Sequence, residues 1–176
     1  MTQRSITAAK EGAKWVPTEA GIAAAVVHAW FPPRRWAVCP NVSWGLPLLG
    51  EADVIAVSSS GKLHEIEIKC SRGDLRADEK KRRWLWSADA RTDYYWLAVP
   101  AALRDDGMRR AEALHAGLFV ASAPPDGDRL PVVERLRCAH RLPSKMSVSP
   151  GDLRNRVWRL ASLRYWDAVF RGAIPR

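Results

Sequence analysis

The chain has 176 residues, a net charge of +9 at pH 7 and a pI of about 10.0. This length suits one domain with a proper core, and the basic balance favours a polyanionic partner, nucleic acid first and an anionic membrane second. No run of about 20 apolar residues is present, which excludes a membrane-spanning helix.

The start of the chain and its cysteines predict a location. The first residues lack the apolar core of a signal peptide, and Cys39, Cys70 and Cys138 do not have the spacing of a metal site. We therefore expect reduced thiols, no zinc site and a cytoplasmic protein. The first residues are also polar and small, which predicts a flexible N-terminus over residues 1–16 and a single domain over residues 17–176.

The first predicted elements are a helix and a strand. Thr18 is expected to cap the helix, with Glu19 in its first turn, and Phe31-Pro32-Pro33 ends it. Residues 35–44 then predict a strand interrupted at Pro40, which indicates an edge strand or a bulge.

A predicted hairpin follows, with strands over residues 51–57 and 62–70, and it carries the most informative residues. Alternation of side chains places Glu67 and Lys69 on one face of the second strand. Asp53 lies on the first strand, and the length of the turn decides whether it meets Glu67.

A two-residue turn would place Asp53 opposite Ile68, on the wrong face. A three-residue loop over residues 59–61 would place it opposite Glu67. Such loops favour a left-handed third residue, usually glycine, and Gly61 occupies that position. We therefore predict the three-residue loop.

Opposed residues on one face bring two carboxylates within roughly 5 Å at their Cβ atoms. Like charges this close are unfavourable unless a cation lies between them, and Mg²⁺ takes carboxylate oxygens while keeping several waters. Lys69, about 7 Å beyond Glu67 on the same face, could orient a metal-bound water or neutralise charge in the transition state.

An ordinary alternative is an exposed strand face with a surface ion pair between Glu67 and Lys69. The isoleucines that alternate with these residues, and the apolar neighbouring strand over residues 54–57, instead favour a central strand. Covering that strand on both sides would desolvate the charges, at a cost that needs compensation.

A second helix is predicted from Ser71 to about Ala90. Its basic run, residues 80–83, fits either a solvated helix or phosphate contacts. Trp84 and Trp86, two of the nine tryptophans, fit either core packing or stacking on bases.

The rest of the chain completes an α/β mixed sheet with a helix on each face. The final helix is capped by Ser149, with Pro150 at its first position, and runs to about Phe170. The other expected elements are a strand over residues 94–99, a short helix over residues 111–115, a strand over residues 117–122 and an antiparallel return over residues 131–137.

The order of these motifs resembles the PD-(D/E)XK nuclease superfamily, and most closely the MmcB-like DNA-repair family within it. The resemblance covers roughly residues 17–123, and alanine rather than proline precedes the first acid. The motifs that carry it are Ala52-Asp53-Val54-Ile55-Ala56, Glu67-Ile68-Lys69-Cys70-Ser71, residues 74–80 and residues 92–100.

The resemblance implies a restriction-endonuclease-like mixed β-sheet flanked by helices. It implies that Asp53, Glu67 and the Ile68 carbonyl bind Mg²⁺ or Mn²⁺, that Lys69 is the catalytic lysine, and that Glu19 completes the metal site. Basic residues beside this site are expected to bind DNA phosphates: Arg72, Arg76, Lys80, Lys81 and Arg83.

The resulting hypothesis is a metal-dependent DNA endonuclease of DNA repair or processing, which could form a homodimer. Two alternatives stay open. The first is a catalytically inactive DNA-binding module of the same fold, and the second is a structural or interaction protein that uses its tryptophans at an interface.

Overall fold

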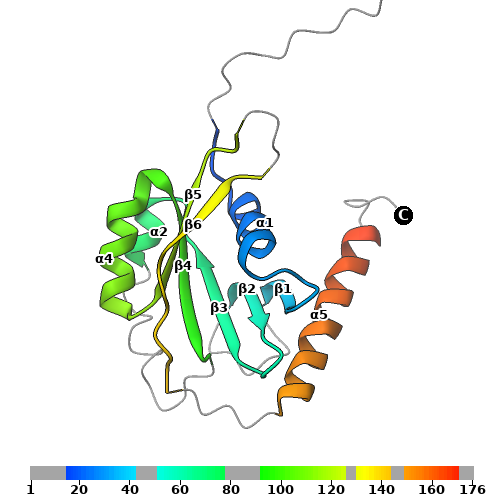
Figure 1. Ribbon diagram of the computed structural model, residues 1–176. Helices are drawn as coiled ribbons and strands as arrows, with labels where there is room; N and C mark the ends of the chain where they lie inside the picture. Colours follow the sequence, from blue (N-terminus) through cyan, green and yellow to red (C-terminus); the bar gives the residue numbers. More distant parts are fainter. Residues whose placement is uncertain (1–14, 43–50, 78–91, 126–129, 144–148, 171–176) are drawn as a thin grey trace, which may run out of the picture.

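The computed structural model describes residues 15–42, 51–77, 92–125, 130–143 and 149–170, with side chains of the last segment described only to Ala161. Six strands form one mixed sheet in the order β1-β2-β3-β4-β5-β6 (Figure 1). The β3–β4 and β4–β5 pairs are parallel and the other pairs are antiparallel. The strands are β1 Ala37–Val42, β2 Ala52–Val57, β3 Leu63–Ile68, β4 Tyr94–Pro100, β5 Gly117–Ser122 and β6 Val132–Arg137.

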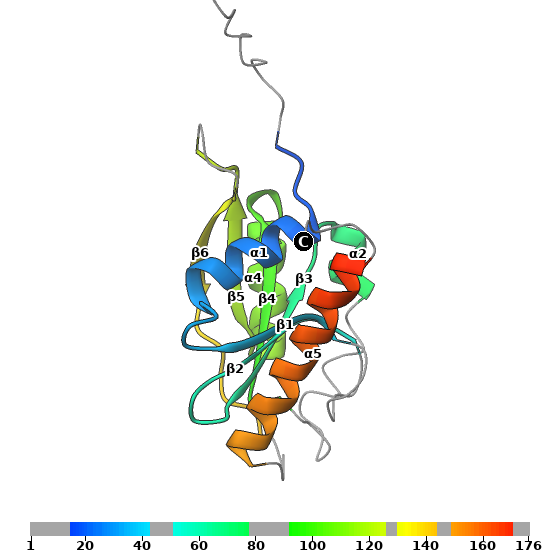
Figure 2. The same ribbon diagram turned by 90° about the vertical axis from the view of Figure 1, so that its right-hand side faces the viewer.

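Helices cover the sheet on both sides, which confirms the predicted fold class. Helix α1 lies on the side of the sheet opposite α2 and α4 (Figure 1), and α5 runs beside β1 and β2 (Figure 2). The helices are α1 Glu19–Trp30, α2 Arg72–Ala77, α4 Arg104–Leu114, preceded by a 3₁₀ turn at Ala101–Leu103, and α5 Pro150–Phe170. In the part of the chain described, none of them has the length and apolar character needed to cross a membrane.

The two predicted caps are confirmed. The Thr18 hydroxyl accepts a hydrogen bond from the Gly21 N–H at 3.1 Å, and the Ser149 hydroxyl accepts one from the Asp152 N–H at 3.2 Å. Each cap satisfies a backbone donor that lacks a partner inside its helix, so both helices begin where the sequence predicts.

The core consists of three clusters, because alternate residues of the central strands point to opposite faces. Residues such as Val54 and Ile66 pack with α1 on one face. Ile55 and Leu63 point the other way and pack with α5. The same face of β4 and β5 packs with α2 and α4 around Leu97. Strand β3 is therefore buried on both sides, as the sequence predicts.

Two predicted boundaries differ from the structure, and a third lies outside the described residues. The strand expected over residues 35–44 begins later, at Ala37, and its expected last two residues lie outside the described residues; it is an edge strand, one of the two possibilities that Pro40 indicated. The short helix expected over residues 111–115 is wrong in extent, because α4 already begins at Arg104. Only the Arg72–Ala77 part of the second helix lies within the described residues.

The reason for the error at α4 is its polar surface. Asp105 and Asp106 occupy the first turn, where acids interact well with the helix dipole, but few apolar residues mark a buried stripe. The helix ends at His115, whose φ of 54° is left-handed and whose N–H caps the last turn.

Candidate active site

The loop between β2 and β3 has the predicted length. The Ser58 N–H donates to the Lys62 carbonyl at 3.0 Å, which closes a three-residue loop over residues 59–61. The Gly61 N–H donates to the Ser58 carbonyl at 3.1 Å, and Gly61 has a φ of 77°. Glycine suits this left-handed position because it has no Cβ to clash with the backbone.

This loop sets the register of the hairpin. Val54 pairs with Ile66 in an antiparallel ladder, so Asp53, one residue earlier, lies opposite Glu67. The two acids therefore share a face at the same end of the sheet, near the start of β2 and the end of β3. The predicted juxtaposition of the acids is confirmed.

Glu67 and Lys69 form a direct ion pair at the end of β3. The Lys69 Nζ donates to Glu67 Oε1 at 2.6 Å, and the two side chains are only 15% and 8% exposed. The pair was expected either on an exposed face or around a cation, and the structure shows a buried pair in contact. Burial of both charges means that each depends on its partner for compensation.

Asp53 lies beside this pair, half-buried. Its Oδ2 accepts a hydrogen bond from the Ile68 N–H at 2.6 Å. Burial raises its pKa to about 6, helped by the negative charges of Glu67 and Glu19 and opposed by the Ile68 hydrogen bond and by Lys69. The carboxylate is therefore fixed in direction while its charge is poorly compensated.

A hollow of about 400 Å³ opens at this end of the sheet. It lies between the start of α1, the start of β2, the end of β3, and α2. Its lining includes Glu19, Asp53, Ile68, Lys69, Cys70 and Asp74. The structure thus brings together four of the five predicted site residues. Glu67 does not line the hollow, but it contacts Lys69 and its negative charge raises the pKa of Asp53.

The hollow has a negative electrostatic character. The pKa of the Cys70 thiol is raised by burial and by the charges of Glu19, Asp74 and Asp53. Asp74 is an acidic lining residue to which the sequence assigned no role. The signal was available, because a helix that follows β3 directly must place its first-turn acid near the end of that strand.

The predicted metal ligands are not assembled into a ready cage. Within the residues described, no group of three or more His, Cys, Asp and Glu side chains stands close enough to hold a metal ion. Mg²⁺, however, commonly uses one or two carboxylates and completes its shell with waters and substrate oxygens. The donor chemistry of Asp53 and Glu19 at one open hollow fits such an ion.

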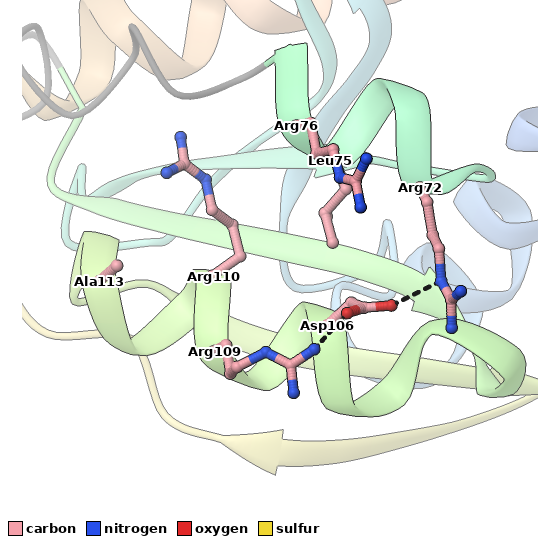
Figure 3. Close-up of a pocket in the computed structure, with 7 residues that line it drawn as sticks. All are labelled: Arg72, Leu75, Arg76, Asp106, Arg109, Arg110 and Ala113. Carbon is pink, nitrogen blue, oxygen red and sulfur yellow. Dashed lines mark hydrogen bonds and ion pairs between the residues drawn. The ribbon is translucent and has the colours of Figure 1, made fainter.

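The predicted DNA-binding residues divide into two groups. Arg72 and Arg76 lie on the side of α2 that faces α4 (Figure 3), whereas Asp74 on the same helix lines the acidic hollow. The other three, Lys80, Lys81 and Arg83, lie outside the described residues, as do Trp84 and Trp86.

His64, on the opposite face of β3, has structural partners. Its Nδ1 accepts a hydrogen bond from Trp96 Nε1 at 3.0 Å, and its ring stacks on Tyr94 at 4.5 Å between centroids. Burial lowers its pKa to about 4, with Asp93 opposing the shift. The ring is neutral at pH 7 and completes an aromatic cluster.

Comparison with known proteins supports the fold alone. No family model matches the chain, and no curated protein matches it. Among solved structures, a protein of unknown function from Silicibacter pomeroyi aligns with a TM-score of 0.54 and 19% identity, over 88% of this chain and 92% of that chain. The two chains are similar in overall architecture, and this similarity carries no information about activity.

Proposed function

We propose that this protein is a divalent-metal-dependent DNA endonuclease of the PD-(D/E)XK type, acting in the cytoplasm in DNA repair or processing. The observation that carries the proposal is the convergence of Asp53, Glu19 and Lys69 on one hollow, with Glu67 paired to the lysine. Like charges this close, with Asp53 half-buried and Glu67 buried, indicate a site that gains from a cation.

Different residues have different roles at this site. Asp53 and Glu19, with Glu67 and the Ile68 carbonyl nearby, would hold Mg²⁺ or Mn²⁺. The Ile68 N–H orients the Asp53 carboxylate and Glu67 orients the Lys69 ammonium. When bound, the ion would polarise the scissile phosphate and lower the pKa of an attacking water.

Lys69 supplies the positive charge that phosphodiester hydrolysis requires beside the reacting phosphate. Its ammonium is mostly buried, so a nearby anion would interact with it more strongly than in water. The net charge of +9 supports a polyanionic substrate, and affinity for such a substrate should fall steeply with salt.

A non-catalytic DNA-binding module of the same fold is the second candidate. The observation that favours it is the direct contact between Lys69 and Glu67. In such a module the pair would be permanent, and it would stabilise the strand end without taking part in chemistry. This candidate predicts DNA binding with no cleavage and no response to Mg²⁺.

The test is cleavage of supercoiled plasmid and of labelled linear DNA with Mg²⁺, with Mn²⁺ and with EDTA. We expect wild type to cut with either metal and not with EDTA. Asp53→Asn and Lys69→Ala should each lower the rate by about 10²-fold or more, the scale found when one charge-stabilising group is removed from an active site.

The matched controls are Glu134→Gln on β6 and Arg34→Ala after α1, both exposed and absent from the lining of the hollow. They should retain wild-type cleavage. DNA binding by wild type with no cutting under any of these metals would leave the module as the function, and residual cutting equal in all variants would reveal a contaminating nuclease.

A further inference from the structure

A second hollow lies on the other side of α2, between that helix and α4, and it differs in charge from the acidic one. It measures about 470 Å³, and the residues around it include Arg72, Leu75, Arg76, Asp106, Arg109 and Arg110 (Figure 3). Four arginines against one aspartate give this groove a net charge of +3. We call it the arginine groove.

Asp106 organises two of the arginines. It accepts a hydrogen bond from Arg72 Nε at 2.9 Å, across from α2, and another from Arg109 on its own helix. Desolvation opposes ionisation here, but the hydrogen bonds and charges of Arg72 and Arg109 hold the pKa of Asp106 below its ordinary value. One carboxylate therefore positions two guanidinium groups and neutralises only one of their charges.

The remaining arginines, Arg76 and Arg110, face the same groove from α2 and α4. Arg76 is exposed and has no ion pair or hydrogen bond with another described residue. Guanidinium groups from two helices around one hollow offer an array of donors that suits a phosphate, which guanidinium binds through paired hydrogen bonds.

The arginine groove continues into a neighbouring hollow of about 260 Å³. The two share Arg72, Asp106 and Arg109, and the second adds Arg104 and Asp105. A single small anion needs no such continuation. A chain with regularly repeated negative charges can occupy both parts.

The lining also indicates which part of a nucleic acid the groove would contact. Its apolar side chains are Leu75 and Ala113, and neither an aromatic ring nor a side-chain amide is among the described residues around it. Stacking of bases on aromatic rings and amide recognition of adenine are therefore not provided by the described residues here. Contacts to phosphates alone give affinity and register without sequence preference.

We propose that the arginine groove binds the phosphodiester backbone of nucleic acid. The proposal rests on the proposed function for the kind of partner but not for any cleavage. Helix α2 would separate the two sites, with Asp74 on the metal side and Arg72 and Arg76 on the phosphate side. The groove would then hold the strand at a point away from the scissile phosphate.

The experiment measures binding of a labelled 20-nucleotide DNA, single-stranded and duplex, by fluorescence anisotropy in EDTA over a series of salt concentrations. The double variant Arg76→Gln and Arg110→Gln should weaken binding by about tenfold, and the slope of log affinity against log salt should become shallower by about two. Because no metal is present, the readout does not depend on catalysis.

The matched control is the double variant Arg34→Gln and Arg35→Gln, which removes the same charge from an exposed turn after α1. It should bind DNA nearly as wild type does. Equal losses in the two double variants would mean that only the total charge matters, and that result overturns the proposal. So would undetectable binding of wild type at low salt.

A second variant tests the groove with all of its arginines in place, so that a loss of binding does not come from a lost arginine contact. Ala113 is an exposed helical residue at the groove, so Ala113→Glu adds a negative charge without removing an arginine. It should weaken binding several-fold, whereas Ala113→Gln should not. Cleavage that persists while all groove variants bind normally would reject the groove and leave the nuclease proposal standing.

Discussion

The two faces of β3 differ in how their buried polar groups are compensated. On one face, His64 is neutral and accepts a hydrogen bond from Trp96 within an aromatic cluster. On the other face, three residues later, Glu67 is charged and pairs with Lys69, while Asp53 lies opposite on β2. The first group is satisfied by a neutral partner, and the second belongs to a set with excess negative charge.

This difference distinguishes a polar group that stabilises the fold from one that belongs to a candidate functional site. A buried polar group with a matched partner costs little and helps to specify the fold. Carboxylates gathered close together remain costly, and at Asp53 burial first, and then the charges of Glu67 and Glu19, raise the pKa. The excess of acid over base, rather than burial alone, therefore marks the site that would gain from a metal ion.

The largest expected effect comes from removing Lys69, the basic side chain among the described residues on the face of β3 that carries Glu67, which we call the acidic face. Lys69→Met would remove the ion pair that Lys69 makes with the buried Glu67, and breaking a buried pair typically costs about 3–5 kcal/mol of unfolding free energy. Urea denaturation should show this loss. Mg²⁺ should restore part of it, because the cation would replace the missing charge.

Lys62→Met is the matched control for Lys69→Met. Lys62 pairs with Asp93 at 3.1 Å but is 37% exposed, and without it Asp93 keeps its hydrogen bond from the Leu63 N–H and its ion pair with Arg141. Loss of Lys62 should therefore cost only about 1 kcal/mol and show no response to Mg²⁺. The double variant Glu67→Gln and Lys69→Met should recover much of the stability. Equal losses for the two lysines would show that the acidic face is an ordinary ion-pair surface.

The second largest effect concerns the pH dependence of the aromatic face. The pKa of His64 is about 4 in the folded protein and 6.5 in a model peptide, so the neutral ring stabilises the fold above pH 6.5. This contribution is lost as the pH falls toward 4. It amounts to about 3 kcal/mol, at 1.36 kcal/mol for each pH unit between the two values.

The variant His64→Phe isolates this contribution. Asp53 acts in the opposite direction, because its raised pKa favours the folded protein below pH 3.8 and that contribution disappears as the pH rises through 6. The free energy of unfolding of wild type should therefore fall relative to that of His64→Phe as the pH is lowered from 7 to 4. A constant difference would place the His64 ring in solvent.

The features that the sequence predicted well are local. Gly61 at the third position of a short loop fixed the hairpin length, and the alternation of acids with isoleucines fixed the faces. Together they placed Asp53 opposite Glu67. A one-residue error would have moved every side chain to the other face, so this prediction depended on a single glycine.

The features that the sequence did not predict depend on distant contacts. Arg72 and Asp106 are 34 residues apart along the chain, and only the packing of α2 against α4 brings them together. The direct contact of Lys69 with Glu67 depends on side-chain rotamers, which strand spacing does not determine. Periodicity indicates faces, but it does not show which helices will share a groove.

A third prediction tests whether both faces depend on the hairpin loop. Gly61→Ala would force a left-handed alanine and place a Cβ 2.4 Å from the Cβ of Pro150 at the start of α5. We expect a loss of about 2 kcal/mol in thermal or urea unfolding. Both the Mg²⁺ response and the pH dependence should remain, because the apolar clusters packed on the two faces of the sheet hold the register of β2 and β3.

Ser60→Ala, an exposed change in the same loop, is the control for Gly61→Ala and should alter stability by less than about 0.5 kcal/mol. Loss of the Mg²⁺ response in the glycine variant would contradict the prediction. It would mean that the loop, rather than the packed strands, holds Asp53 opposite Glu67.

The smallest effect, and the one with the most informative sign, belongs to Asp53→Asn. Asparagine keeps an oxygen that can accept the Ile68 N–H bond but removes one negative charge from beside Glu67 and Glu19. Without metal, this variant should therefore melt about 2–4 °C above wild type. With Mg²⁺, wild type should gain stability and the variant should not. Glu134→Gln, on the exposed surface of β6, should change neither value. A variant that melts below wild type without metal would show that the Asp53 charge supports the fold, and the acidic face would then resemble the aromatic one.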